Sequence, residues 1–370
     1  MTPPSLPPLR FTPLFKHRIW GGRTLETRLG KRLPPHTTIG ESWEITGYGS
    51  EQSRVSSGPF AGARIEDLLR REGTRLVGNH CGCDVFPLLY KFIDANDRLS
   101  IQVHPNDEQA RRSGQDQRGK TECWYVADAV PGATIIVGFR EGVSRNDILP
   151  AIESRTLDTL LNRFSVQKGD LLYIPAGTVH AILDGTLVYE VQETSDVTLR
   201  LYDWGRLDER GNPRELHVEP SLQVLDFCAH HQHRIEGAVV ESGANLLRTF
   251  RVACRYFAIE ELHFLAAGTA PLWRRDSFQV ICVMEGAAEV ISPHGSEPLA
   301  TGESILIPAA CTDVAVCAEE GGRVLVSWVP DLHADVIAPL RKSGLDDSII
   351  ARVGGYDRSN DLLPLLTMQT

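Results

Sequence analysis

The sequence predicts a mainly β protein built from barrel modules that carry a few helical segments. Most of the chain alternates short runs rich in β-branched and aromatic residues with Gly, Pro and Asp turns. Helical periodicity is confined to four segments, and a Gly and Pro pattern near the middle of the chain recurs near its end. Many short strands with few helices are typical of β-barrels and sandwiches.

The expected strands of the first half of the chain follow one another at short intervals. Each is a run of apolar and β-branched residues that ends at a turn residue, as strands usually do. The run 170–177 is apolar without alternation, which indicates a strand buried on both faces. In chain order the strands are expected at 38–49, 87–94, 99–105, 121–126, 133–139, 170–177, 187–192 and 197–204.

The four helical segments interrupt these runs, so we interpret them as insertions into a barrel. They lie at 63–78, 105–114, 144–164 and 218–227.

A second β-rich region is expected from about Arg248 to Trp328, after the polar segment 229–245. That segment contains three histidines, His230, His231 and His233. A metal site would need further ligands, and neither a carboxylate nor a cysteine suited to that role lies nearby in the sequence. We therefore interpret the segment as a solvated linker and expect domains at 1–235 and 236–370.

An internal repeat indicates that the barrel has been duplicated. The segments 166–183 and 299–316 both contain a glycine, five further residues and then a proline, about 133 residues apart. Each reads as a turn, a buried strand and a second turn. The first copy has a histidine, His180, where the second has Asp313. We expect the first copy to hold a metal ion and the second to lack one.

Composition and charge restrict the class of protein. A chain of 370 residues is long enough for two domains, and 42% hydrophobic with 23% charged residues is ordinary for a globular protein. A net charge of −10 argues against nucleic acid as a partner. The sequence shows neither a membrane span nor a signal peptide, so we expect a cytoplasmic protein without a membrane partner. Eight cysteines without a CxxC pair predict free thiols.

Polar residues in the run IQVHPND suggest a metal site. Gln102 and His104 are two apart, so on a strand both side chains point to the same face. Glu122 and His180 begin or follow neighbouring strands, and together the four offer an amide oxygen, a carboxylate and two imidazoles. The alternative is that each is a hydrogen-bonded core residue, which is a weaker explanation for all four together. The donor set suits catalytic Zn²⁺ but would also accept Mn²⁺, Fe²⁺ or Co²⁺.

Several stretches resemble a known family. The run from Gly169 to His180 resembles the second sequence motif of the cupin superfamily. IQVHP at 101–105, followed by KTE at 120–122, resembles the first motif of class I, zinc-dependent mannose-6-phosphate isomerases in their short bacterial form. Similarity in the same order extends over 11–25, 40–45, 99–107, 119–126, 173–182 and 196–206. The resemblance implies two cupin (jelly-roll) barrels with a small helical insertion, the second without a metal.

The resemblance also implies roles for individual residues. It makes Gln102, His104, Glu122 and His180 the ligands of one zinc ion per chain. It makes Arg200 a catalytic arginine, and arginine offers a rigid fork of donors that suits a phosphate or an enediolate.

Other residues of the site follow from the same resemblance. Lys120 falls at the position of an active-site lysine, and Ser100 and Lys91 fall where substrate contacts lie. Arg206 matches a basic position implicated in phosphate binding. Glu190 matches an acidic position and is a candidate proton carrier, although a carboxylate at a strand end could equally be solvated. The base that moves the proton stays open between Glu190, a metal-bound hydroxide and another group.

The implied function is reversible isomerisation of mannose 6-phosphate and fructose 6-phosphate through an enediolate, whose charge the metal and Arg200 stabilise. No redox cofactor is needed. Two alternatives stay open at this point. A non-catalytic sugar-binding cupin would not need Lys120, Arg200 and Glu190 together. A different cupin enzyme, acting on another sugar phosphate or as a dioxygenase, would share the metal ligands, but the glutamine and the arginines argue against a dioxygenase.

Overall fold

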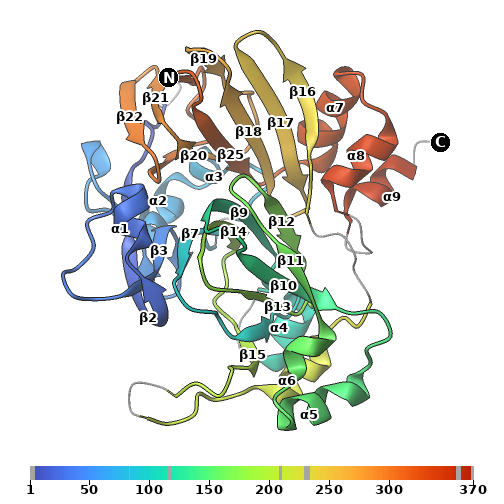
Figure 1. Cartoon of the computed structure of the whole chain (residues 1–370). Helices are drawn as coiled ribbons and strands as arrows, with labels where there is room; N and C mark the ends of the chain where they lie inside the picture. Colours follow the sequence, from blue (N-terminus) through green and yellow to red (C-terminus); the bar gives the residue numbers. More distant parts are fainter. Residues whose placement is uncertain are drawn as a thin grey trace.

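The protein folds into two β-barrels that lie one above the other (Figure 1), which confirms the predicted mainly β fold. The computed structural model describes residues 5–82, 84–114, 118–207, 211–228, 234–355 and 360–367. His230, His231 and His233 lie outside these residues. No helix within the described ranges is both long and apolar enough to cross a bilayer.

The first barrel consists of two facing antiparallel sheets. Its six-stranded sheet has the order β12-β9-β14-β7-β3-β2. Those strands are Leu171–Ile174, Glu122–Ala129, Thr186–Glu193, Leu88–Ala95, Ile39–Ile45 and Leu14–Gly22. Its five-stranded sheet has the order β11-β10-β13-β8-β15. These strands are Leu161–Ser165, Thr134–Phe139, His180–Ile182, Ile101–Val103 and Leu199–Tyr202. Short ribbons pair β1 with β6 and β4 with β5 (Phe11–Thr12, Arg54–Val55, Gly47–Tyr48 and Glu51–Gln52).

The second barrel repeats this arrangement, except that β15 has no counterpart in the facing sheet as the structure describes it. Its six-stranded sheet has the order β23-β20-β25-β18-β17-β16, read from the edge that matches β12. Those strands are Ser304–Ile307, Gln279–Glu285, Arg323–Trp328, Ala258–Phe264, Leu246–Ala253 and Ala238–Ser242. The facing sheet has the order β22-β21-β24-β19, formed by Gly295–Ala300, Ala287–Ser292, Ala315–Ala318 and Gly268–Pro271. The same order in space and along the chain shows that the repeat reflects a duplicated barrel.

The two barrels share one hydrophobic core. Tyr90, Phe92 and Tyr189 of the first six-stranded sheet belong to the same buried cluster as Val280 and Leu325 of the second. Complete burial of side chains of this size stabilises the fold by about 1.5–3 kcal/mol each. The barrels are therefore held together by packing of apolar sheet faces.

Helices lie at the periphery of the barrels (Figure 1). The predicted segments 63–78, 105–114 and 218–227 contain α2 and α3, α4, and α6, respectively. The segment 144–164 is helical only through α5, because residues 161–165 form β11 and pair with β10 instead. Sheet pairing here overrides local helical periodicity. The helices are α1 Thr24–Leu29, α2 Ile65–Glu72, α3 Thr74–Val77, α4 Asp107–Ser113, α5 Arg145–Glu153 and α6 Val218–Val224, with short 3₁₀ turns at Gly58–Phe60 and Leu157–Leu160.

A helical C-terminal segment, which the sequence analysis did not anticipate, covers the outer face of β16 and β17 (Figure 1). Its residues Val336, Leu340, Ile350 and Leu362 are fully buried in one cluster with Phe250. The segment consists of a π-helical turn at Leu332–Ile337, α7 Ala338–Lys342, α8 Asp347–Val353 and α9 Leu362–Thr367.

Candidate active site

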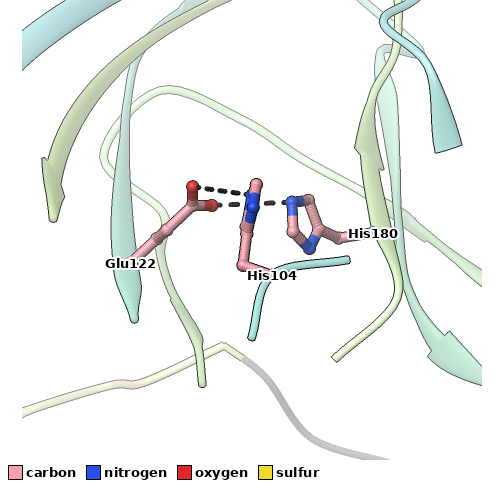
Figure 2. A group of neighbouring side chains, drawn as sticks. All are labelled: His104, Glu122 and His180. Atoms are coloured by element: carbon pink, nitrogen blue, oxygen red, sulfur yellow. Dashed lines mark ion pairs between the residues drawn. The ribbon is translucent and has the colours of Figure 1, made fainter. Parts of the chain in front are cut away.

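Three of the predicted metal ligands meet inside the first barrel (Figure 2). Glu122 begins β9, His180 begins β13, and His104 directly follows β8. Their ligand atoms lie within 4.8 Å of one another, and all three side chains are buried. Within the described residues, they are the only such group of His, Cys, Asp or Glu close enough to hold an ion.

The hydrogen bonds of the two histidines prepare them for a metal ion. Nδ1 of His104 lies 2.7 Å from the Val197 carbonyl oxygen, and Nδ1 of His180 lies 2.8 Å from that of Thr178. A ring that donates through Nδ1 presents the lone pair of Nε2, and this contact also fixes the ring's orientation. Both Nε2 atoms face Glu122, at 3.2 and 3.6 Å from its carboxylate oxygens.

Glu122 is the clearest sign that a cation belongs here. Its Oε2 is buried and makes no hydrogen bond with any described residue. A buried carboxylate facing two imidazole lone pairs is unfavourable without a positive charge between them. The residues present therefore fit a divalent metal ion.

Gln102 completes the predicted donor set. It lies on β8 directly opposite His180 in the strand register, and its side-chain amide is 3.3 Å from His180 Nε2. The two ends of an amide are assigned from the hydrogen-bond network, and the opposite orientation would turn Oε1 toward the histidine. Ser100, two residues earlier on the same face, lies 3.3 Å from the Gln102 amide.

Burial and nearby charges set the protonation states of the ligands. Burial, helped by the Lys120 ammonium, lowers the pKa of His104 to about 3, and burial also lowers the pKa of His180. Burial opposes ionisation of Glu122, but the Lys120 ammonium outweighs it and holds the pKa of that carboxyl well below its usual value. The set is therefore two neutral imidazoles and one carboxylate, which are the forms that bind metal ions.

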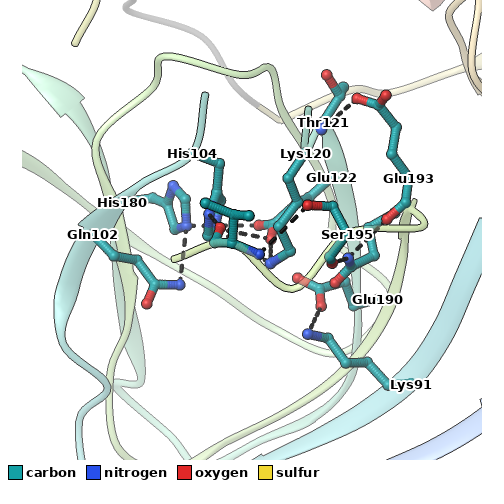
Figure 3. A network of polar contacts seen from close by, with 12 residues as sticks. Lys91, Gln102, His104, Lys120, Thr121, Glu122, His180, Glu190, Glu193 and Ser195 are labelled. Carbon is teal, nitrogen blue, oxygen red and sulfur yellow. Dashed lines mark hydrogen bonds and ion pairs between the residues drawn. The ribbon is translucent and has the colours of Figure 1, made fainter. Parts of the chain in front are cut away.

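Two lysines extend the polar network around the ligands (Figure 3). The Lys120 ammonium contacts the Glu122 carboxylate and lies 3.3 Å from His104 Nε2. Lys91 pairs with Glu190 at 2.6 Å because β7 and β14 place them opposite each other. Burial, together with repulsion from Lys120, lowers the pKa of Lys91 to about 8.

A cavity of about 390 Å³ opens beside the ligand set. Predicted residues that line it are Lys91, Ser100, Gln102, Lys120, Glu190 and Arg200. The sequence analysis missed other lining residues, including Arg18, Glu41, Trp124 and Arg214. Arg18 and Glu41 fall within stretches that resemble the family, so the resemblance could have identified them. Arg214 follows the last of these stretches, and nothing in the sequence marked it as a site residue.

The arginines differ in how they reach the cavity. Arg200 lies on β15 opposite Gln102, so it is next to the ligand set. Its Nη1 donates to the Glu215 carbonyl at 2.9 Å, and its buried Nε makes no hydrogen bond with the described residues. Arg206 lies outside the cavity lining, held by Asp203 at 2.5 Å. Arg214 shares Asp203 at 3.2 Å and does line the cavity.

Glu193 supports the site from the end of β14. It is buried, and its Oε1 accepts the backbone N–H of Thr121, between Lys120 and Glu122, at 2.8 Å. Burial, together with repulsion from Asp107, raises the pKa of Glu193 to about 8. The folded protein therefore keeps a proton on Glu193 at pH values where the unfolded chain has released it.

The raised pKa of Glu193 predicts a pH-dependent stability. Its stabilising contribution is complete below about pH 4.5 and is lost as the pH rises through about 8, a change of up to roughly 5 kcal/mol. Urea unfolding at pH 5.5 and pH 8.5 should show a smaller loss of stability for Glu193→Gln than for the wild type. Glu108→Gln, at an exposed side chain, is the control. Equal pH dependence in all three proteins would contradict the assignment.

Comparisons with known proteins agree on one family. Residues 9–129 match the family model for phosphomannose isomerase type I, catalytic domain. The chain is 38% identical to mannose-6-phosphate isomerase ManA of Bacillus subtilis over 302 residues, which are 81% of this chain and 93% of that protein. The crystal structure of the mannose 6-phosphate isomerase from Bacillus subtilis superimposes with a TM-score of 0.79 at 33% identity, covering 86% of this chain and 99% of that one. A putative mannosephosphate isomerase from Archaeoglobus fulgidus shares the fold, with a TM-score of 0.70 at 22% identity, covering 89% of this chain and 99% of that one.

Proposed function

The chain belongs to the type I phosphomannose isomerases, which interconvert mannose 6-phosphate and fructose 6-phosphate, and we propose that the cavity beside His104, Glu122 and His180 is where this isomerisation takes place. The observation that carries the proposal is the buried Glu122 carboxylate facing two neutral histidines, next to a cavity lined with lysine and arginine. A non-catalytic sugar-binding protein would need the cavity but not this combination of a buried carboxylate, two neutral histidines and several cationic side chains. Purified protein should isomerise mannose 6-phosphate, lose activity on chelation and regain it when a divalent metal is added.

We propose that the metal is one Zn²⁺ ion per chain, held by Gln102, His104, Glu122 and His180. Nitrogen and oxygen ligands without thiolates suit catalytic zinc. Only Glu122 neutralises charge, so a bound divalent ion keeps net positive charge and supplies Lewis acidity to the sugar oxygens.

The chain's own residues stabilise the developing charge and transfer the protons. Arg200, next to Gln102, is placed to stabilise the negative charge that develops on the sugar oxygens when the proton leaves C2. Glu190 lines the cavity and is held by Lys91 and by Trp124 Nε1 at 2.8 Å, so we assign it the transfer of this proton from C2 to C1. A second proton passes from O2 to O1, and Lys120 is placed to relay it. Ser100 orients the Gln102 amide.

We propose that Arg214, rather than Arg206, holds the substrate phosphate. Arg214 lines the cavity and uses only one of its nitrogens, Nη1, to contact Asp203. Its repulsion of Arg200, second to burial, lowers the pKa of that guanidinium, which shows that the two charges are close. A dianionic phosphate would relieve this repulsion.

Arg214→Ala should raise KM for mannose 6-phosphate by about 10- to 100-fold, because one charge-assisted hydrogen bond contributes about 1.5–3 kcal/mol. Its kcat should change little, since phosphate is bound in both the ground and the transition state. Arg206→Ala is the matched control, because that arginine shares Asp203 but lies outside the cavity. A raised KM for Arg206→Ala alone would assign the phosphate to Arg206.

We also propose a cytoplasmic location. All seven cysteines in the described part of the chain are free thiols, as expected in a reducing compartment.

A further inference from the structure

The second barrel contains a cavity of about 390 Å³, matching the volume of the one at the proposed active site. We propose that it is a second binding site, without a metal, for a sugar phosphate. Residues that line it include Trp273, Arg274, Arg275, Gln279, Thr312 and Asp313.

The strand register shows that this cavity corresponds to the active-site cavity of the first barrel. Glu122 on β9 is paired with Ile174 on β12, and Gln279 on β20 is paired with Ile307 on β23. Both isoleucines directly precede the proline of the internal repeat. Gln279 therefore occupies the position of the metal-binding Glu122.

The facing sheet extends the correspondence to the other ligands. Asp313 follows Pro308 by five residues, as His180 follows Pro175. Pairing between β19 and β24 continues past Pro271 and Ala315, because the Leu272 N–H donates to the Val314 carbonyl at 2.9 Å. Trp273 and Asp313 are the next residues of the two segments, beyond this last hydrogen bond. By their positions relative to it, Trp273 corresponds to Gln102 and Asp313 to His180.

An arginine replaces the remaining histidine of the ligand set. Arg275 follows Trp273 by two residues, as His104 follows Gln102. Its side chain is only 2% exposed, and its Nη2 lies 2.9 Å from Glu260 Oε2. Nη1 donates to the Gln279 side-chain oxygen at 2.5 Å, and the guanidinium lies 3.5 Å from the centre of the Trp328 ring. The second barrel therefore has a permanent internal cation where the first has metal ligands.

Two of the three charged side chains that line this cavity are arginines, Arg274 and Arg275, and the third is Asp313. The Glu260 carboxylate is shared by two buried guanidiniums, those of Arg275 and Arg248. Arg248 also contacts Glu241, but that side chain is 49% exposed and solvent screens its charge. Arg274 adds an exposed guanidinium at the cavity. Arginine is well suited to bind phosphate through parallel hydrogen bonds.

The remaining lining suits a sugar. Trp273 offers a flat apolar face against which a sugar ring can pack. Thr312 and Asp313 are accessible hydrogen-bonding groups for hydroxyls, and Gln279 lies deeper. A small cavity with an aromatic wall, a few polar groups and an accessible guanidinium matches a phosphorylated monosaccharide.

The double variant Arg274→Ala/Asp313→Ala tests the second site, because both side chains are exposed and the net charge is unchanged. The matched control is Arg341→Ala/Asp347→Ala, which removes an ion pair of 2.9 Å on the C-terminal helices. Fructose 6-phosphate should be titrated calorimetrically into the metal-loaded full chain. Isomerisation leaves the total sugar phosphate constant. We expect the control to bind one more equivalent of sugar phosphate than Arg274→Ala/Asp313→Ala. If the double variant still binds at the second site, its affinity there should be at least roughly tenfold weaker than that of the control.

This difference does not depend on the proposed active site. If the first barrel failed to bind sugar phosphate, the control should still bind one equivalent that the double variant loses. Equal stoichiometry and affinity in the two proteins would overturn the proposal. Inorganic phosphate and free mannose should each bind this site at least about tenfold more weakly than fructose 6-phosphate, because each makes only part of the contacts. Equally tight binding of either one would refute a sugar phosphate as the ligand.

Discussion

His104→Ala is expected to remove the bound metal and with it nearly all isomerase activity. The substitution deletes one of two neutral imidazoles and leaves the buried Glu122 carboxylate with Lys120 as its main cationic neighbour. Loss of a residue that only orients a ligand costs about 10- to 100-fold in metal affinity, so loss of the ligand itself should cost more. Elemental analysis should find about one divalent ion per wild-type chain and little in the variant.

His180→Ala should behave in the same way, because His180 Nε2 faces the other oxygen of the same carboxylate at 3.6 Å. His263→Ala, on β18 of the second barrel, is the matched control and should keep both metal and activity. Circular dichroism separates loss of metal from loss of fold, and His104→Gln preserves more of the buried volume if the alanine variant unfolds. Full metal content and activity in both ligand variants would show that the site is misassigned.

Arg200→Ala is expected to lower kcat and kcat/KM by similar factors of about 10²–10³, with metal content unchanged. Loss of one preorganised donor to a developing oxyanion typically has this effect, about 3–4 kcal/mol. Arg200 is preorganised because its Nη1 is held by the Glu215 carbonyl at 2.9 Å. Steady-state kinetics with mannose 6-phosphate measures both constants.

Arg200→Lys should not restore full activity, because a single ammonium cannot reproduce the planar fork of the guanidinium. Because lysine keeps the positive charge, this variant distinguishes the effect of the charge on kcat from the effect of the guanidinium geometry. A normal kcat with a raised KM in Arg200→Ala would assign this arginine to holding the phosphate beside Arg214. The stabilisation of developing charge would then not depend on Arg200.

Local patterns in the sequence predicted much of the fold. Apolar runs ending at turn residues predicted the strands that became β7, β9, β10, β12 and β14, since strand formation depends on residues close in sequence. The glycine and proline repeat predicted the second barrel for the same reason. Residues 161–164 were predicted to be helical, but pairing of β11 with β10, about 25 residues away in the chain, decided their structure.

Some features of the site were likewise predicted from local sequence patterns, and others were found only in the structure. By itself, the sequence determined that Gln102 and His104 share one face and that His180 follows a repeated turn, because side-chain period and turn geometry are local properties. Only the tertiary structure decided that Lys91 pairs with Glu190 and that Arg214 lines the cavity. It alone also showed that Gln279 stands where the first barrel has Glu122. These contacts depend on strand register and on loops that pack across the barrel. Both bring together residues that are far apart in the sequence, and no local pattern predicts that such residues will meet.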